Sequence, residues 1–211
     1  MQDTYKVLIL GDTKCGKTAL LDSIVYDQFL EEYFPSIGYT EVEYPVGAAA
    51  GLNSISLKFV ELSLNEEYGD ILPKAYRDSS IVIFVCSYDS QQSLNVLKEK
   101  VYPFISEKLG QQNFLPFLIM TKSDILDSTD QVDLHDFQLF AAKIDTQPLM
   151  VSAKTKFNIL DIVKFLRISI VEYYNNKNKK KNINTVESLK SVAIESPKKD
   201  SKKEEKSCLL V

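Results

Sequence analysis

The chain has 211 residues and a net charge of −4, and 45% of its residues are hydrophobic and 26% charged. This composition is typical of one globular domain with length to spare for a tail. No run approaches the ~20 consecutive apolar residues of a membrane span, no basic leader opens the chain, and three widely spaced cysteines with one histidine disfavour a disulfide framework or a metal cluster.

The first predicted element is a strand at residues 6–10 (KVLIL), because an unbroken apolar run suits a strand buried on both faces. GDTKCGKT follows directly and fits the phosphate-binding pattern G-x-x-x-x-G-K-[ST] without a gap. Its glycines let backbone N–H groups converge on phosphates, beside a helix N-terminus. Lys17 is expected to reach the β- and γ-phosphates and Thr18 to bind Mg²⁺. The expected phosphate-binding residues are Gly11, Asp12, Thr13, Lys14, Cys15, Gly16, Lys17 and Thr18.

A helix and a hairpin are predicted next. Apolar spacing indicates a helix over residues 18–29. Residues 40–46 and 54–62 read as strands joined by the glycine-bearing loop GAAAGLN, which predicts a hairpin at the sheet edge. A second buried strand is predicted at residues 81–86 (IVIFVC), followed by a helical segment that Pro103 should kink.

The remaining elements complete the alternation of strands and helices. They are a strand at residues 114–120 (FLPFLIM), a helix at 132–143, a strand at 149–151 (LMV) and a last helix capped by Asn158. Together with the edge hairpin, this order predicts an α/β fold. The expected architecture is a P-loop three-layer sandwich with a mostly parallel, doubly wound sheet.

Two short motifs indicate which base a bound nucleotide would carry. In TKSD, at residues 121–124, Asp124 can accept hydrogen bonds from guanine N1–H and the guanine 2-amino group, which adenine lacks. SAK follows the last short strand, at residues 152–154. In this order behind GDTKCGKT, the motifs resemble those of the Ras-superfamily small GTPases, with the Rab branch as the nearest pattern. The resemblance covers roughly residues 5–174 and predicts a small GTPase domain over residues 1–174.

The resemblance assigns roles to both motifs. It implies that Lys122 lies along the guanine ring, that Asp124 specifies guanine, and that residues 152 and 153 support the base through the backbone. The family usually has asparagine at the position of Thr121, although threonine also occurs there in the Rho branch. The implied ligands are GTP or GDP with Mg²⁺. The implied guanine-binding residues are Thr121, Lys122, Asp124, Ser152, Ala153 and Lys154.

Residues 33–39 (YFPSIGY) resemble the first switch of the Rab branch. Ser36 lies 19 residues after Lys17, which is the family's spacing. This implies that the Ser36 hydroxyl binds Mg²⁺ and that its backbone N–H meets the γ-phosphate. Gly38 favours Rab, whereas TKSD leans toward Rho, so the branch stays open. The implied effector region is Tyr33, Phe34, Pro35, Ser36, Ile37, Gly38, Tyr39, Thr40 and Glu41.

The second switch departs from the family pattern Asp-x-x-Gly-Gln, because this chain has ELSLN at residues 61–65. Glu61 keeps a carboxylate for a water-mediated Mg²⁺ contact, Leu64 replaces a glycine, and Asn65 replaces the glutamine that orients the attacking water. Phosphoryl transfer depends mainly on positioning, so a GTP hydrolase with slow intrinsic activity and a degenerate catalytic position at Asn65 is expected. The alternative is a pseudo-GTPase, a binding module or scaffold that does not cycle.

Residues 175–211 differ in composition and predict a flexible, lysine-rich tail with a net charge of +5, against −9 for residues 1–174. The final CLLV fits C-a-a-X, which predicts prenylation of Cys208, with geranylgeranyl favoured. A prenyl chain with a basic stretch predicts attachment to the cytoplasmic face of a membrane, beside a cytosolic pool. Nucleic-acid binding by the lysines is the lesser alternative. The Rab resemblance implies vesicle traffic or signalling, with effector, exchange-factor and activating proteins as partners.

Overall fold

The structure is a computed structural model that describes residues 3–32, 38–49, 52–62, 75–110, 113–125 and 128–173. The chain divides into two units, residues 1–171 and residues 172–211. Of the second unit, only residues 172 and 173 are described, and they are helical. The fold below is that of the first unit.

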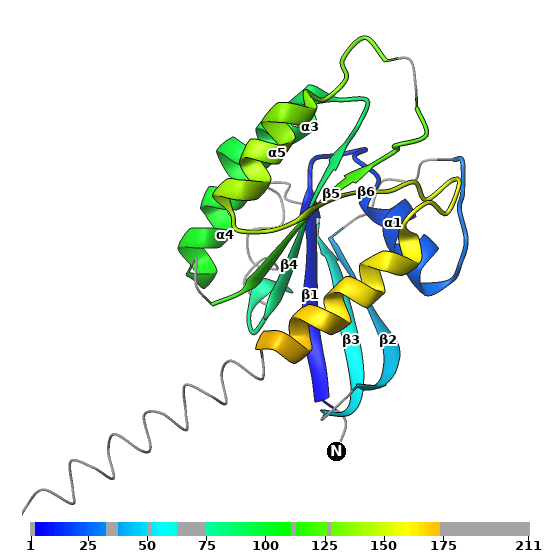
Figure 1. Cartoon of the computed structure of the whole chain (residues 1–211), viewed down its shortest axis with the longest axis vertical. Coiled ribbons are helices and arrows are strands. Elements are labelled where there is room, and N and C mark those ends of the chain that lie inside the picture. Colours follow the sequence, from blue (N-terminus) through cyan, green and yellow to red (C-terminus); the bar gives the residue numbers. More distant parts are fainter. Residues whose placement is uncertain are drawn as a thin grey trace, which may run out of the picture. The chain divides into compact units, whose positions relative to one another are not determined.

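A sheet with strand order β2-β3-β1-β4-β5-β6 forms the centre of the described part of this unit (Figure 1). Neighbouring strands are parallel except for the antiparallel pair of β2 and β3 at one edge. This confirms the α/β class, the mostly parallel sheet and the edge hairpin. The strands are β1 (Asp3–Gly11), β2 (Tyr39–Ala49), β3 (Leu52–Leu62), β4 (Ile81–Ser87), β5 (Leu115–Thr121) and β6 (Pro148–Met150).

The hairpin strands are longer than predicted, and most of the expected loop GAAAGLN belongs to β2 and β3. The pairing shifts register between Pro45 and Gly47, and Gly47 has a φ of 81°. Because glycine tolerates this conformation, the irregularity is absorbed without ending either strand. β6 begins one residue earlier than predicted, and the N–H of Val151 just beyond it bonds the carbonyl of Met120 on β5 at 2.8 Å.

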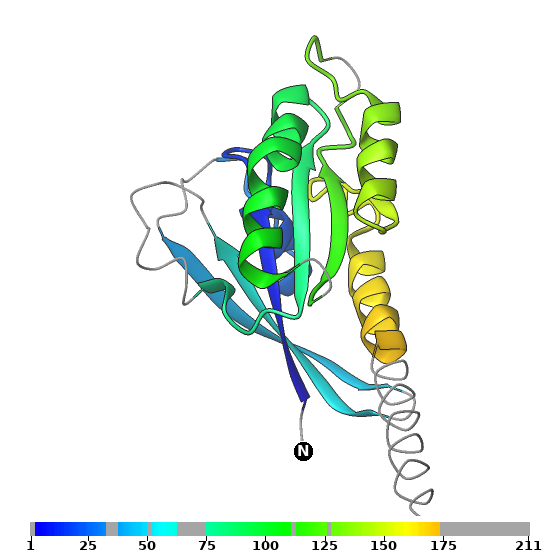
Figure 2. The same ribbon diagram turned by 90° about the vertical axis from the view of Figure 1, so that its left-hand side faces the viewer.

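Helices pack on both faces of the sheet (Figures 1 and 2). Apolar residues of α3, η2, α4 and α5 form one buried cluster with side chains of β1, β3, β4 and β5, including the edge-to-face pair of Phe84 and Tyr102. Within the first unit, the helix from residue 159 to residue 171, yellow in Figure 1, crosses in front of the strands. The other helices of the described part of this unit include α1 (Lys17–Val25), α3 (Gln91–Val96), η2 (Leu97–Val101), α4 (Tyr102–Leu109) and α5 (Leu134–Lys143).

Two predicted helix details are wrong, each for a local reason. Helix α1 ends at Val25 rather than at residue 29, because Asp27 adopts a left-handed φ of 53° and the N–H of Gln28 bonds back to the Asp22 carbonyl. Asn158 precedes the last helix but does not cap it through an accepting side chain. Its φ is 57°, and its amide donates to the Met150 carbonyl at 2.9 Å.

The kink expected at Pro103 stays a prediction, but the helix is irregular beside this proline. This proline lies in the first turn of α4, where its missing N–H is tolerated, and the irregularity lies just before it as the π-helical turn η2. A proline ring cannot accommodate the carbonyl four residues earlier, which here belongs to η2, so the wider turn relieves that clash.

The fold brings the candidate site together at one edge. β1, β3, β4, β5 and β6 run parallel, so the segments that follow them meet at the carboxyl edge of the sheet. Helices of the described part of the chain lack the combination of length and apolar character that crossing a lipid bilayer would need.

Candidate nucleotide-binding site

A cavity of about 850 Å³ opens at the carboxyl edge of the sheet. It is lined by the loop after β1, the start of α1, the end of β3 and the segments that follow β4, β5 and β6. The predicted site residues that line it are Thr13, Lys14, Gly16, Lys17, Thr18, Glu61, Thr121, Lys122, Asp124, Ala153 and Lys154. The structure thus brings the motifs that are predicted to bind phosphate and guanine to one cavity.

The loop between β1 and α1 has the tight path that its glycines permit. A Cβ at Gly11 would lie 2.2 Å from the Val85 carbonyl oxygen, so this position has no room for a side chain. Gly16 has a φ of 88° and Lys14 a φ of 60°, both in the left-handed region. These two left-handed residues curve the backbone just before the N-terminus of α1, as a phosphate-binding loop requires.

The side chain of Lys17 curls back over this loop. Its Nζ donates to the carbonyl of Gly11 at 3.1 Å and to the carbonyl of Asp12 at 2.7 Å, and the residue is buried. The Asp12 carboxylate in turn accepts from the N–H of Thr13 at 2.7 Å. The loop therefore holds an ammonium group in its own concavity, the place where a phosphate chain would need positive charge.

Thr18, a predicted Mg²⁺ ligand, is in direct contact with Glu61, which is predicted to reach the cation through a water. The Thr18 hydroxyl donates to Glu61 Oε1 at 2.6 Å, and Glu61, near the end of β3, is only 2% exposed. Hydroxyl and carboxylate oxygens are the hard ligands that Mg²⁺ prefers. The residues present therefore fit this cation, and the extra methylene of Glu61 does not prevent its carboxylate from reaching Thr18.

The base end is the part of the cavity where the nucleotide base is predicted to bind, and the phosphate end is the part at the loop between β1 and α1. At the base end, Asp124 is oriented by Ser152. The Ser152 hydroxyl donates to Asp124 Oδ1 at 2.6 Å and accepts the N–H of Thr155 at 3.0 Å, and Ser152 is fully buried. The backbone N–H of Ser152 is directed to the Phe157 carbonyl instead of the cavity. Ser152 thus acts on Asp124 through its side chain, whereas a backbone contribution was expected. Ala153 lines the cavity, and its contact with guanine stays a prediction.

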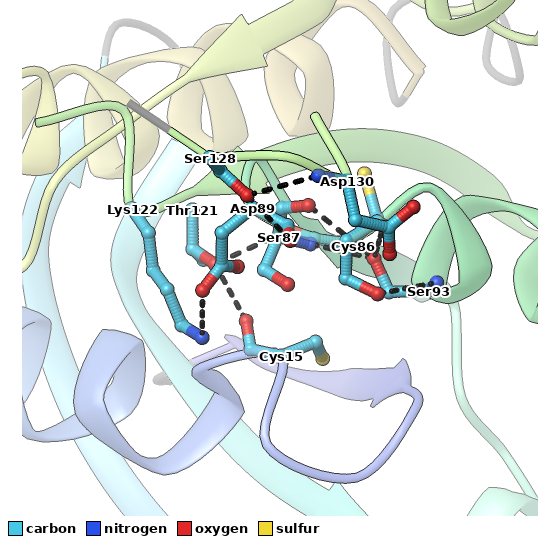
Figure 3. Close-up of polar contacts among 10 residues, drawn as sticks. Cys15, Cys86, Ser87, Asp89, Ser93, Thr121, Lys122, Ser128 and Asp130 are labelled. Carbon is cyan, nitrogen blue, oxygen red and sulfur yellow. Dashed lines mark hydrogen bonds and ion pairs between the residues drawn. The ribbon is translucent and has the colours of Figure 1, made fainter. Parts of the chain in front are cut away.

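Thr121 joins the base end to the phosphate end (Figure 3). Its buried hydroxyl lies 2.5 Å from the Cys15 carbonyl of the phosphate loop and 3.2 Å from the Cys86 carbonyl of β4. Burial raises the pKa of the Cys15 thiol to about 11, so this side chain stays uncharged beneath the loop. Cys15 contributes its backbone rather than a reactive sulfur.

The structure places Gly38 and the first residues of β2 at the edge of the sheet. Tyr39 and Thr40 are exposed there, and Glu41 forms an ion pair with Lys58 of β3 at 2.7 Å. The other effector and switch positions lie outside the described residues, as does the predicted lipidation site. These are Tyr33, Phe34, Pro35, Ser36, Ile37, Leu64, Asn65 and Cys208.

Several residues of the cavity were not predicted. Asp89, three positions beyond the predicted strand at 81–86, forms an ion pair with Lys122 at 3.0 Å. Its place after a buried parallel strand was the signal that could have identified it. Phe29 and Asp22 also line the cavity, and burial raises the pKa of Asp22. Lysines after β6 pair with carboxylates after α1, namely Lys154 with Glu31 at 3.2 Å and Lys156 with Asp27 at 3.1 Å.

A phosphate loop between β1 and α1, at the carboxyl edge of a doubly wound sheet, defines a P-loop nucleotide-binding protein. The sequence pattern of the Ras family matches residues 6–172. The chain belongs to the Ras family of small GTPases, as its motifs predicted, and members of this family bind guanine nucleotides, generally with Mg²⁺.

Relatives of known identity come from both the Rho and the Rab branches. The GTP-binding protein RHO4 of Eremothecium gossypii is 33% identical over 168 residues, covering 74% of this chain and 61% of the relative. A GTP-binding RHO-like protein of Candida albicans is 30% identical over 76% of this chain and 44% of its own length. The Ras-related protein RABF2b of Arabidopsis thaliana is 29% identical over 74% of this chain and 76% of its own length. The aligned region thus spans less than two thirds of both Rho relatives.

Proposed function

We propose that this Ras-family chain is a membrane-tethered molecular switch that binds GTP and GDP in the cavity and hydrolyses GTP slowly. One observation carries the binding part of the proposal. The cavity holds the Lys17 ammonium at one end and the Asp124–Ser152 pair at the other, on a single sheet edge. A nucleotide needs both, a cationic cradle for its phosphates and acceptors for its base.

Magnesium completes the phosphate end of the proposed site. Thr18 and Ser36 of the first switch would bind it directly and Glu61 through a water, and the cation would neutralise charge on the phosphates. Support comes from the contact between Thr18 and Glu61, which already places a carboxylate beside the Thr18 hydroxyl. Glu61 keeps a carboxylate here although the family pattern has aspartate.

Slow hydrolysis is proposed from the second switch. Leu64 and Asn65 replace the glycine and glutamine of the family pattern, and the shorter amide of Asn65 reaches the attacking water less well. A chain that binds GTP but does not cycle at all is the second candidate, since the same substitutions favour it. Retained GTP with no turnover would select that candidate.

Membrane tethering is proposed from the tail. Cys208 stands in a prenylation motif, and the lysines between residues 177 and 206 supply the second signal that one prenyl chain requires. The site of action is proposed to be the cytoplasmic face of a membrane, in vesicle traffic or signalling. Effector, exchange-factor and activating proteins would bind the two switches.

The experiment that tests the proposal identifies the bound nucleotide. Chromatography of the nucleotide released from purified protein should yield GDP or GTP, and unlabelled GTP should displace fluorescent GDP while ATP does not. Asp124→Asn should shift preference from guanine toward xanthine nucleotides, because an amide reverses one hydrogen bond at the base. Asp161→Asn, on the last helix, is the matched control and should leave selectivity unchanged. Equal displacement of GDP by ATP and GTP would refute the proposal.

A further inference from the structure

Asp89 and Lys122 form an ion pair inside the cavity that none of the motifs accounts for. Lys122 Nζ lies 3.0 Å from Asp89 Oδ2, and the side chains are 34% and 26% exposed. Figure 3 shows the two groups facing each other across the space between the segments that follow β4 and β5. Both residues line the cavity. The ion pair therefore fixes the direction of Lys122 before a ligand enters.

The backbone around Asp89 is held from two sides. The hydroxyl of Ser128 donates to the Asp89 carbonyl at 3.3 Å. The neighbouring Tyr88 donates its N–H to the Thr121 carbonyl and accepts the N–H of Val132, both at 2.9 Å. Such a fixed backbone leaves the Asp89 carboxylate few positions to occupy. It is a preorganised acceptor for an ammonium group.

Lys122, by contrast, has a long side chain with many conformations, on a backbone with a left-handed φ of 56°. An ammonium group is strongly hydrated and mobile unless a partner holds it. Restricting the side chain in advance lowers the entropy cost of binding a ligand against it. The partner that supplies this restriction is Asp89.

Stability alone does not explain the placement of Asp89. Its second carboxylate oxygen, Oδ1, is buried without a hydrogen-bond donor among the described residues. A buried polar atom of this kind costs stability rather than adding to it. A cost tolerated at the wall of a binding cavity points to a role in binding.

We propose that Asp89 is a positioning residue for the guanine base, acting through Lys122. By holding the ammonium group, Asp89 lays the alkyl stem of Lys122 along the cavity wall, where the flat face of the base packs against it. The inference rests on the proposed guanine-nucleotide site and adds a specificity element to it. Asp89 itself need not touch the nucleotide.

A double-mutant cycle on the full chain tests the coupling, with the dissociation rate of fluorescent GDP as the readout. Asp89→Asn should accelerate release about fivefold, the scale of a partly exposed ion pair. In a Lys122→Ala background the same substitution should change the rate less than about twofold, because its partner is gone. Asp130→Asn is the matched control, since the hydrogen bonds shown by Asp130 involve only its backbone. That variant should release GDP like the parent.

Ionic strength provides a second readout that does not require the Lys122→Ala protein to retain nucleotide. Salt screens a partly exposed ion pair, so release from the parent should accelerate with salt more steeply than release from Asp89→Asn. Unchanged release from Asp89→Asn, or equal acceleration in both backgrounds, would overturn the inference alone. A parent protein without preference for guanine would overturn the proposed function and this inference with it.

Discussion

The hydroxyl of Thr121, at the end of β5, lies 2.5 Å from the carbonyl oxygen of Cys15 in the phosphate loop. The two residues are 106 positions apart in the chain, and both are buried. Because Thr121 also opens TKSD, the segment predicted to bind the base, one hydroxyl anchors this segment to the loop predicted to bind the phosphates. Movement of either loop is therefore expected to affect the other.

Thr121→Val tests this anchor. Valine has nearly the same shape as threonine but no hydroxyl. The buried Cys15 carbonyl therefore loses its hydrogen-bond donor, which should cost about 1–3 kcal/mol of unfolding free energy. It should also accelerate GDP release, because the two loops lose their common support. Urea unfolding and stopped-flow release of fluorescent GDP measure the two effects.

Thr146→Val is the control for the anchor. Thr146 also donates its hydroxyl to a carbonyl, that of Pro116 at 2.7 Å, and it does not line the cavity. It should lose stability without faster GDP release. If both variants changed release equally, the effect of Thr121 would be one of general stability and not of loop coupling.

The ion pair of Lys98 and Asp136 predicts a pH dependence of stability. The hydrogen bond from Lys98, at 2.7 Å, lowers the pKa of Asp136 below its ordinary 3.8. A carboxyl group whose pKa is depressed in the folded state contributes stability above its unfolded pKa, and this contribution is lost as pH falls through the folded pKa. Asp136→Asn should therefore lower the unfolding free energy at pH 7, and the difference from the parent should shrink below about pH 4.

Glu107→Gln is the matched control for this prediction, because Glu107 pairs with Lys108 at 2.8 Å in an exposed position. Exposed pairs contribute little to stability, so this variant should unfold like the parent at neutral pH. Chemical denaturation at a series of pH values decides the matter. A loss for Asp136→Asn that stays constant down to pH 2 would contradict the assignment.

The tail predicts that Cys208 anchors the protein to membranes. Cys208→Ser should move a fluorescently tagged protein into the soluble fraction, because the thiol that accepts the prenyl group is gone. Neutralising the tail lysines should give a partial loss, since one lipid chain binds only marginally without the basic signal. Fractionation and mass spectrometry of the C-terminal peptide report both. A Cys208→Ser protein that still sediments with membranes would exclude prenylation as the anchor.

The second switch predicts the rate of hydrolysis. Restoring the family pattern with Leu64→Gly and Asn65→Gln should raise single-turnover hydrolysis, by a factor of about 10²–10³ if one positioned contact is recovered. Nucleotide affinity should change little, since the groups at both ends of the cavity are untouched. The single variant Leu64→Gly separates backbone freedom from the water-orienting amide. If the unmodified protein already hydrolysed GTP as fast as a relative with an intact second switch, this interpretation would be wrong.

The sequence by itself determined the class of fold and both ends of the site. The pattern GDTKCGKT after a buried strand, and the carboxylate of Asp124 after another, are contiguous in the chain, so their chemistry can be recognised without coordinates. Unbroken apolar runs predicted the parallel strands, because a strand that is buried on both faces of the sheet does not alternate between apolar and polar residues. Helix ends were predicted less well, as Asp27 and Asn158 show, since a left-handed residue is chosen by local hydrogen bonds rather than by type.

Only the tertiary structure decided which groups act on one another. Thr18 meets Glu61, Thr121 meets Cys15, and Lys122 meets Asp89, across separations of 43, 106 and 33 residues. Sheet order and register bring these pairs together, and no periodicity in the chain encodes them. The physical reason is that a short motif specifies its own backbone and chemistry, whereas a partner is selected by the packing of strands that lie far apart in sequence.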